Sequence, residues 1–313
     1  MRAFAERIAL TLSTSALFVV FSEMMFWGRF DYAKPGLVLG YLGAWALYSV
    51  ITYAVLWMLA TFHVADFRAL FLVGAVYGWL AEGVAVQTMY KQLPLSISFT
   101  GLAWHALLTV GVGWYALRRA LQNSLARTAQ TAVLIGVGWG LWSVWWWTDQ
   151  HLVTPLPEFV SYAFITTLVL VAALWLVARI SPEFRPSRAE RLVVSTAFGL
   201  YYVFVTVPGD WRSLVILPPC LTGALLALRR NQEVEYRHDL LHNVSGPIAV
   251  ERLAVLVLMP LAAVVVYGLL LLADIALPTG PVLYAVTVPT GFVLFAVYAI
   301  GLLRRQHATS GRG

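Results

Sequence analysis

Long, nearly uninterrupted runs of apolar residues dominate the chain, and they are separated by short polar stretches. A helix that crosses a bilayer needs about 20 mostly apolar residues. These runs are apolar on every side, as in a membrane bundle, whereas a surface helix of a soluble domain has an apolar stripe. The pattern predicts an all-α, polytopic integral membrane helix bundle with about ten transmembrane helices. The predicted spans are residues 8–29, 36–61, 67–90, 95–117, 128–149, 157–179, 190–207, 212–229, 252–274 and 281–303.

The longest polar stretch, RRNQEVEYRHDLLHNVSGP, covers residues 229–247 and predicts a loop over 230–250. His238 and His242 are four residues apart and next to Asp239, a spacing that could ligate a metal. With no third ligand nearby, a solvated loop is the favoured interpretation, and no metal site is predicted. No soluble domain fits elsewhere, so 1–313 is expected to form a single transmembrane domain. Ten spans would also allow two pseudo-halves of opposite orientation, 1–150 and 157–313.

Composition places the chain in a bilayer. It is 60% hydrophobic and 12% charged, with a mean hydropathy of +0.78, whereas soluble domains carry about 25% charged residues. The net charge of +6 does not indicate a nucleic-acid partner, because the basic residues stand at the ends of the predicted spans. The lipid bilayer is the expected partner, and the inner (cytoplasmic) membrane is the expected location.

The basic residues also predict the topology. With the N-terminus in the cytoplasm, 17 of the 21 Lys and Arg residues lie on the inner side. The outer side holds four, which are Arg29, Lys34, Lys91 and Arg212. Because inner loops of membrane proteins are enriched in Lys and Arg, both termini are predicted to be cytoplasmic.

Three ionisable residues fall inside predicted spans: Glu23, Glu82 and His105. At a rise of about 1.5 Å per residue, all three lie within roughly 2 to 7 Å of the bilayer centre, on its outer side. Ionisable residues at this depth usually mark pathways, relays or catalytic sites. The three predict an outward-facing intramembrane polar site. Further polar residues flank it on the outer side: Gln87, Ser98, Asp149, His151 and Asp210.

Helical spacing predicts which of these side chains meet. Glu82 shares a helix face with Gly74 and Gly78, and His105 shares a face of the next span with Gly101. Small residues let helices approach closely, and a short turn joins the two spans. The expectation is a contact between Glu82 and His105, because each would relieve the desolvation of the other. Glu23 would join them only if the first span packs alongside.

Three functions from different classes remain open. A small-solute or proton-coupled transporter is favoured, because ten short-looped spans resemble the drug/metabolite transporter superfamily in helix number and length. A membrane-embedded enzyme with a Glu/His site is the first alternative. A structural subunit or scaffold of a membrane complex is the second, in which the polar residues serve packing only. A small-molecule or lipid-like ligand and a packing partner or homo-oligomer are compatible with these readings, and the cofactor is unknown.

The enzyme alternative has a local basis in the sequence. The stretch from LAEGVAVQ to FTGLAWHA, residues 80–106, is loosely similar to the glutamate and histidine motifs of the CPBP intramembrane proteases. That family has paired glutamates and a Phe-x-x-x-His motif. In this chain Glu82 follows Ala81, and Phe99 precedes His105 by six residues rather than four. The stretch therefore does not assign the family.

Overall fold

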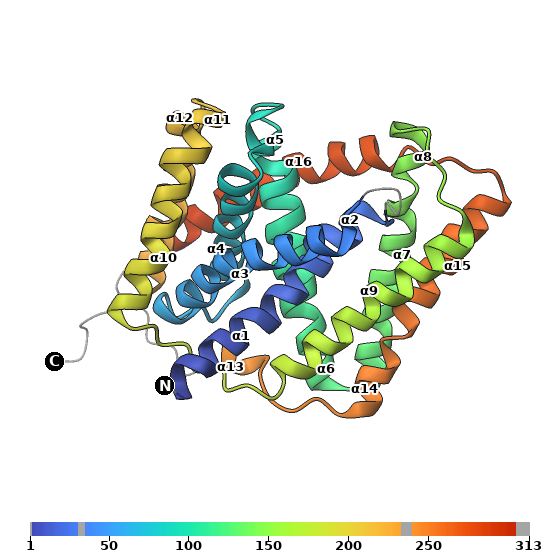
Figure 1. Cartoon of the computed structure of the whole chain (residues 1–313), viewed down its shortest axis with the longest axis horizontal. Helices are drawn as coiled ribbons and strands as arrows, with labels where there is room; N and C mark the ends of the chain where they lie inside the picture. The colour runs from blue at the N-terminus through green and yellow to red at the C-terminus, as the bar shows by residue number, and fades with distance from the viewer. Residues whose placement is uncertain (1, 31–34, 233–239, 305–313) are drawn as a thin grey trace. The chain divides into compact units, whose positions relative to one another are not determined.

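The structure is a computed structural model that describes residues 2–30, 35–232 and 240–304 (Figure 1). All regular elements in these ranges are helical. The all-α prediction is thereby confirmed. His238 and Asp239 lie outside the described residues, and so does the middle of the loop expected over 230–250.

The described chain divides into two compact units, each built from three separate stretches. Unit 1 comprises Met1–Thr52, Val112–Pro182 and Val244–Val286, and unit 2 comprises Tyr53–Gly111, Glu183–Asn243 and Thr287–Gly313. Three long helices, α3 (Leu37–Thr61), η4 (Phe99–Ala116) and α16 (Thr279–Leu303), supply residues to both units. The division into pseudo-halves 1–150 and 157–313 stays a prediction.

The remaining elements belong to one unit each. Those of unit 1 are α1 (Arg2–Val19), η1 (Val20–Met24), α2 (Met25–Trp27), α6 (Leu117–Asn123), α7 (Leu125–Ser143), α8 (Trp145–Asp149), α9 (Leu156–Val177), α14 (Val250–Val255) and α15 (Leu258–Leu272). Those of unit 2 are α4 (Phe67–Trp79), η2 (Leu80–Ala85), η3 (Thr88–Tyr90), α5 (Ser96–Ser98), α10 (Arg188–Tyr201), η5 (Tyr202–Thr206), α11 (Val207–Gly209), α12 (Ser213–Gln232) and α13 (Leu240–Asn243).

Nine helices in the described residues are long and apolar enough to cross a membrane. They are Ala3–Trp27, Leu37–Thr61, Phe67–Ala85, Ser96–Asn123, Leu156–Val177, Arg188–Gly209, Ser213–Asn231, Val250–Leu272 and Thr279–Leu303. The fifth of the ten expected spans, 128–149, is the exception. It forms α7, whose early turns carry Arg127 and Gln130, and the helix breaks at Val144 before α8. These polar residues reduce its hydropathy.

Small residues determine how the helices pack in unit 1. Helix α7 lies along α15 (Figure 1). A β-carbon added at Gly136 would lie 2.2 Å from the Met259 carbonyl oxygen, and one added at Gly140 would lie 2.6 Å from that of Ala263. The two backbones therefore approach too closely for any other residue at these positions. This is the small-xxx-small contact of membrane helices.

Unit 2 contains the same kind of contact where the sequence predicted it. A β-carbon at Gly74 would lie 2.8 Å from the Ala106 backbone, and one at Gly78 would lie 2.2 Å from the Gly101 carbonyl oxygen. The small-residue faces of the third and fourth predicted spans are thus packed together. This close approach brings Glu82, one turn beyond Gly78, next to the helix that carries His105.

Four segments within the spans, η1, η2, η4 and η5, have π-helical hydrogen bonding. The wider π turn disturbs the regular bonding of backbone carbonyls, and in a bilayer these groups need partners from the protein. Side-chain hydroxyls supply them at the end of η2. The carbonyls of Gly83, Val84 and Ala85 accept hydrogen bonds from Tyr90 (2.8 Å), Thr206 (3.0 Å) and Tyr201 (3.3 Å), respectively.

Backbone carbonyls at the end of the first span likewise accept hydrogen bonds from side chains, and here the donors are aromatic residues. The carbonyls of Met24, Phe26 and Trp27 accept hydrogen bonds from the Tyr162 hydroxyl, the Trp142 indole (2.7 Å) and the Trp146 indole, respectively. The donors come from α9, α7 and α8. Three helices are thereby joined to the last turns of one span.

Whether α7 crosses the membrane decides the topology, because ten crossings place both termini on one side and nine place them on opposite sides. Asn123 and Gln150 are exposed and bracket α7 and α8. Single cysteines at these positions, in a Cys220→Ala background, should react with an impermeant maleimide from opposite sides: position 150 in intact cells and position 123 only in inverted vesicles. Labelling of both from one side would contradict the cytoplasmic placement of both termini.

Candidate functional site

Glu82 and His105 are in direct contact in unit 2. The His105 Nε2 atom lies 2.8 Å from the Glu82 Oε1 atom, and the two residues are 8% and 1% exposed. The contact that the sequence predicted between them is therefore present. The Tyr77 ring packs edge-on against the imidazole, with centroids 5.3 Å apart. The pair thus lies between packed helices.

The second oxygen of the Glu82 carboxylate also has a partner, because it accepts a hydrogen bond from the Thr88 hydroxyl. Glu82 belongs to η2, Thr88 to η3 and His105 to η4, so one carboxylate joins three consecutive elements. A buried charge in a bilayer costs about 2.5 to 3.5 kcal/mol on insertion scales. Partners on both oxygens offset part of that cost, and they suit a carboxylate that fixes helices in place.

Glu23, in η1 of unit 1, has different surroundings. Its Oε1 atom accepts a hydrogen bond from the Tyr48 hydroxyl at 2.5 Å, and its Oε2 atom accepts one from the Trp27 indole at 3.0 Å. The carboxylate is half-buried, unlike that of Glu82. Hydrogen bonds from two neutral donors fix its orientation.

A cavity of about 650 Å³ opens beside this carboxylate within unit 1. Pockets of roughly 300 to 1,000 Å³ are typical of small-molecule sites. The described residues that line it are Glu23, Trp27, Arg29, Gly36, Leu37, Gly40, Tyr41, Ala44, Trp146 and Leu152. Trp27 and Leu152 are 42% and 38% exposed, so the cavity is not sealed from its surroundings.

One face of α3 forms a wall of this cavity. Leu37, Gly40, Tyr41 and Ala44 follow the i, i+3, i+4, i+7 spacing of a single helix face. Tyr48, one turn further, ends the same face at its hydrogen bond to Glu23. No atom lies within 4 Å of the position that a β-carbon would take at Gly40. The cavity therefore exists because small residues leave this face unfilled.

The flanking polar residues have varied roles. Ser98 is buried and donates a hydrogen bond to the Val288 carbonyl at 2.7 Å, which is a packing contact in unit 2. Gln87 has a left-handed backbone (φ 59°) and donates to the Val205 carbonyl at 3.4 Å. Asp149 and His151 are exposed, and Asp149 accepts a hydrogen bond from the neighbouring Thr148. None of these four lines the cavity beside Glu23.

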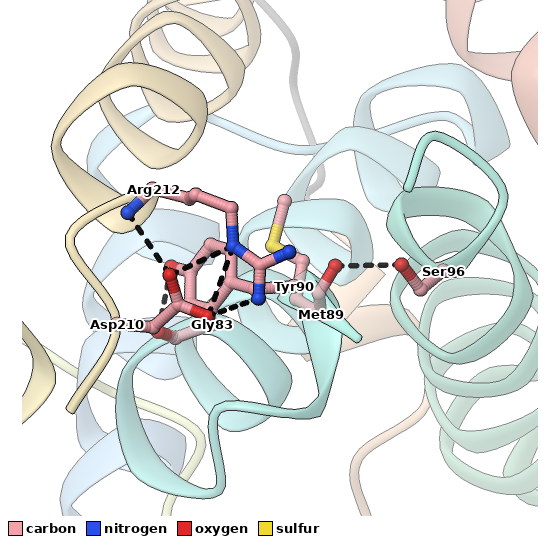
Figure 2. A network of polar contacts seen from close by, with 6 residues as sticks. All are labelled: Gly83, Met89, Tyr90, Ser96, Asp210 and Arg212. Atoms are coloured by element: carbon pink, nitrogen blue, oxygen red, sulfur yellow. Dashed lines mark hydrogen bonds and ion pairs between the residues drawn. The ribbon is translucent and has the colours of Figure 1, made fainter. Parts of the chain in front are cut away.

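Asp210 forms an ion pair with Arg212 in the turn before α12 (Figure 2). The guanidinium donates from Nη2 at 2.5 Å and from Nε at 2.9 and 3.1 Å. These bonds hold the pKa of Asp210 below its usual value. Figure 2 also shows the hydrogen bonds that the Tyr90 hydroxyl donates to the Gly83 carbonyl and the Ser96 hydroxyl to the Met89 carbonyl. All these contacts order the turns of unit 2.

The two intramembrane glutamates belong to different units. Glu82 pairs with His105 in unit 2, and Glu23 has its own partners in unit 1. The single outer cavity expected to border all three residues stays a prediction. Among the described residues, no three His, Cys, Asp or Glu side chains gather as metal ligands would.

Several residues of the Glu23 site were not singled out from the sequence. Trp27 and Trp146 are of the residue type that anchors spans at the membrane interface, and Arg29 enters the sequence analysis only as one of the four outer basic residues. Tyr41 and Tyr48 carry a usable signal, since their spacing places them on one face of the second predicted span together with Gly40. No sequence signal pairs that face with Glu23, because its neighbours at helical spacing, such as Val19 and Phe26, do not form a small-residue face like the one beside Glu82.

Comparisons with protein-family models, with curated proteins and with solved structures give no match.

We expect Glu82 and His105 to be coupled energetically. Glu82→Gln and His105→Ala should each lower the free energy of unfolding by roughly 3 to 5 kcal/mol, because each leaves a buried partner unsatisfied. The double variant should lose less than the sum of the two, by about 0.5 to 3 kcal/mol. Denaturation in mixed micelles measures all four species, and strictly additive losses would contradict the coupling.

Proposed function

We propose that this protein binds a small solute in the cavity beside Glu23 and carries it across the membrane. One observation carries the proposal: a cavity of about 650 Å³ is lined by an intramembrane carboxylate and by the side chains of Trp27, Tyr41 and Trp146. Ligand sites are mostly apolar and aromatic, with a few polar groups that fix the orientation of the ligand. The composition of this lining fits that description.

Transport, rather than binding alone, is supported by the position of the site. Glu23 lies inside the span Ala3–Trp27, on a π-helical segment. Short π segments often coincide with functional sites, and an ionisable residue within a span is costly unless it serves a pathway. The wall of the cavity that α3 forms belongs to a second span, Leu37–Thr61. A small shift between these two spans would change access to the cavity.

In this proposal the Glu82–His105 pair has a structural role. Both carboxylate oxygens have partners, and the pair is buried between packed helices. This is the arrangement that the scaffold interpretation expects of an intramembrane carboxylate. We assign it to holding η2, η3 and η4 together, while Glu23 faces the solute.

Transport can be tested without knowledge of the solute by measuring whether a residue of the cavity wall is accessible from each side of the membrane. In a Cys220→Ala background, Ala44→Cys should react with an impermeant methanethiosulfonate reagent from the outer face in intact cells and from the cytoplasmic face in inverted vesicles. Two-sided reactivity is expected because a carrier exposes its site alternately to each side. Reactivity from one side only would contradict transport.

Two variants of α3 provide the matched comparison. Gly40→Leu adds a side chain into the cavity, where no atom lies within 4 Å of its β-carbon position, and it should slow the labelling of Ala44→Cys at least tenfold. Gly43→Leu adds the same side chain to the same helix, where there is equal space but no contact with the cavity. It should leave the labelling rate unchanged, and equal effects of the two variants would contradict the cavity assignment.

A further inference from the structure

The described residues that line the cavity include one group of each charge. Among its described residues Glu23 supplies a carboxylate and Arg29 a guanidinium, while the others are apolar, aromatic or glycine. The two formal charges cancel. A solute with a net charge would satisfy one of these groups and be repelled by the other, whereas a solute with both charges would satisfy both.

Arg29 is held in a position from which it can bind an anion. Its guanidinium carbon lies 5.7 Å from the centroid of the Trp146 ring. A cation–π contact of this kind does not use the N–H groups as hydrogen-bond donors. In the described part of the chain, the structure gives Arg29 no ion pair. A planar guanidinium binds carboxylate and phosphate groups through two parallel hydrogen bonds.

The backbone that places Arg29 is itself constrained. Gly28 has a left-handed backbone (φ 65°) and ends the first span. A β-carbon at this position would lie 2.8 Å from the Ser143 hydroxyl oxygen. Glycine is therefore required both by its φ angle and by the close approach to α7. The turn at Gly28 fixes where Arg29 leaves the helix.

Glu23 is fixed at the other charged position. Tyr48 and Trp27 donate to one oxygen each. A ligand ammonium at this carboxylate would also lie near the aromatic side chains of the lining, which attract cations. The site therefore presents a carboxylate with aromatic neighbours and a guanidinium stacked on an indole in one cavity.

We infer that the cavity takes a zwitterion: an ammonium group bound at Glu23, a carboxylate or phosphate bound at Arg29, and an apolar body against Trp27, Tyr41 and Trp146. This inference rests on the proposed function and names its substrate class. The chemistry fits a free amino acid with a large apolar side chain, and it also fits a lipid headgroup such as phosphoethanolamine.

Calorimetry on the purified full chain tests the ligand class with three probes of similar shape. These are L-phenylalanine, which carries both charges, 2-phenylethylamine, which carries the cation only, and 3-phenylpropionate, which carries the anion only. L-phenylalanine should bind at least tenfold more tightly than either of the others. Dihexanoylphosphatidylethanolamine and dihexanoylphosphatidylglycerol form the lipid arm, in which the zwitterionic lipid should bind more tightly if a headgroup is the source.

Two variants assign the charges. Glu23→Gln should remove the preference for the zwitterion over 3-phenylpropionate, and Arg29→Gln should remove the preference over 2-phenylethylamine. Their controls are Glu158→Gln, an exposed glutamate, and Arg179→Gln, whose guanidinium carbon lies 3.6 Å from the Trp175 ring centroid. Neither control residue lines the cavity, and both control variants should keep the wild-type preferences.

The outcomes separate this inference from the proposed function. If only the zwitterionic lipid binds, with the same response to the variants, the zwitterion is supported and a headgroup is its source. If a singly charged probe binds as tightly as the zwitterion, or if no zwitterionic probe binds, the ligand class is overturned. Two-sided reactivity of Ala44→Cys would still support transport in that case, while one-sided reactivity would overturn transport whatever the calorimetry shows.

Discussion

A bilayer offers no water to satisfy backbone polar groups, and this constraint explains two irregular regions of the structure. Both regions contain a π-helical segment with a glutamate, and both end at a left-handed residue five positions later, Gly28 after Glu23 and Gln87 after Glu82. In each, three carbonyls near the end of the segment accept hydrogen bonds from side chains of other elements. These bonds fix the segments in place, and the carboxylates are positioned with them.

The same local design leads to two different environments for the carboxylate. Around Glu82 the neighbouring helices approach through glycine contacts until His105 and Thr88 occupy both oxygens. Around Glu23 the neighbouring face of α3 carries Gly40 and Ala44, and the space that they leave remains open. The small residues that bring helices together in one unit thus open a cavity in the other. The two environments differ in whether the backbone of another helix fills the space beside the small residue.

Much of the architecture could be predicted from the sequence. Apolar runs predict spans because bilayer thickness sets helix length, and nine of the ten expected runs form such helices. The contact of Glu82 with His105 also follows from local information, since both lie on small-residue faces of helices joined by a short turn. Patterns within one helix or between two neighbouring helices therefore carry these predictions.

The remainder depends on contacts that no local pattern encodes. Hydropathy does not distinguish π-helical from α-helical bonding, so η1 and η2 could not be foreseen. The pairing of Tyr48 with Glu23 joins two spans, and no pattern in the sequence matches one span to the other. The cavity depends on the space left by small side chains, which a sequence pattern does not show. Trp146 is of the residue type that anchors spans at the membrane interface. Only the fold shows that it lines the cavity.

The central claim is that Glu23 faces a cavity open to small molecules, whereas Glu82 is sequestered as a structural contact. Dicyclohexylcarbodiimide, an apolar reagent that modifies accessible protonated carboxyl groups, tests both parts in one experiment when its adducts are mapped by mass spectrometry. We predict an adduct at Glu23 that Gly40→Leu suppresses and Gly43→Leu does not, and little modification of Glu82. Modification of Glu82 in preference to Glu23 would contradict the account.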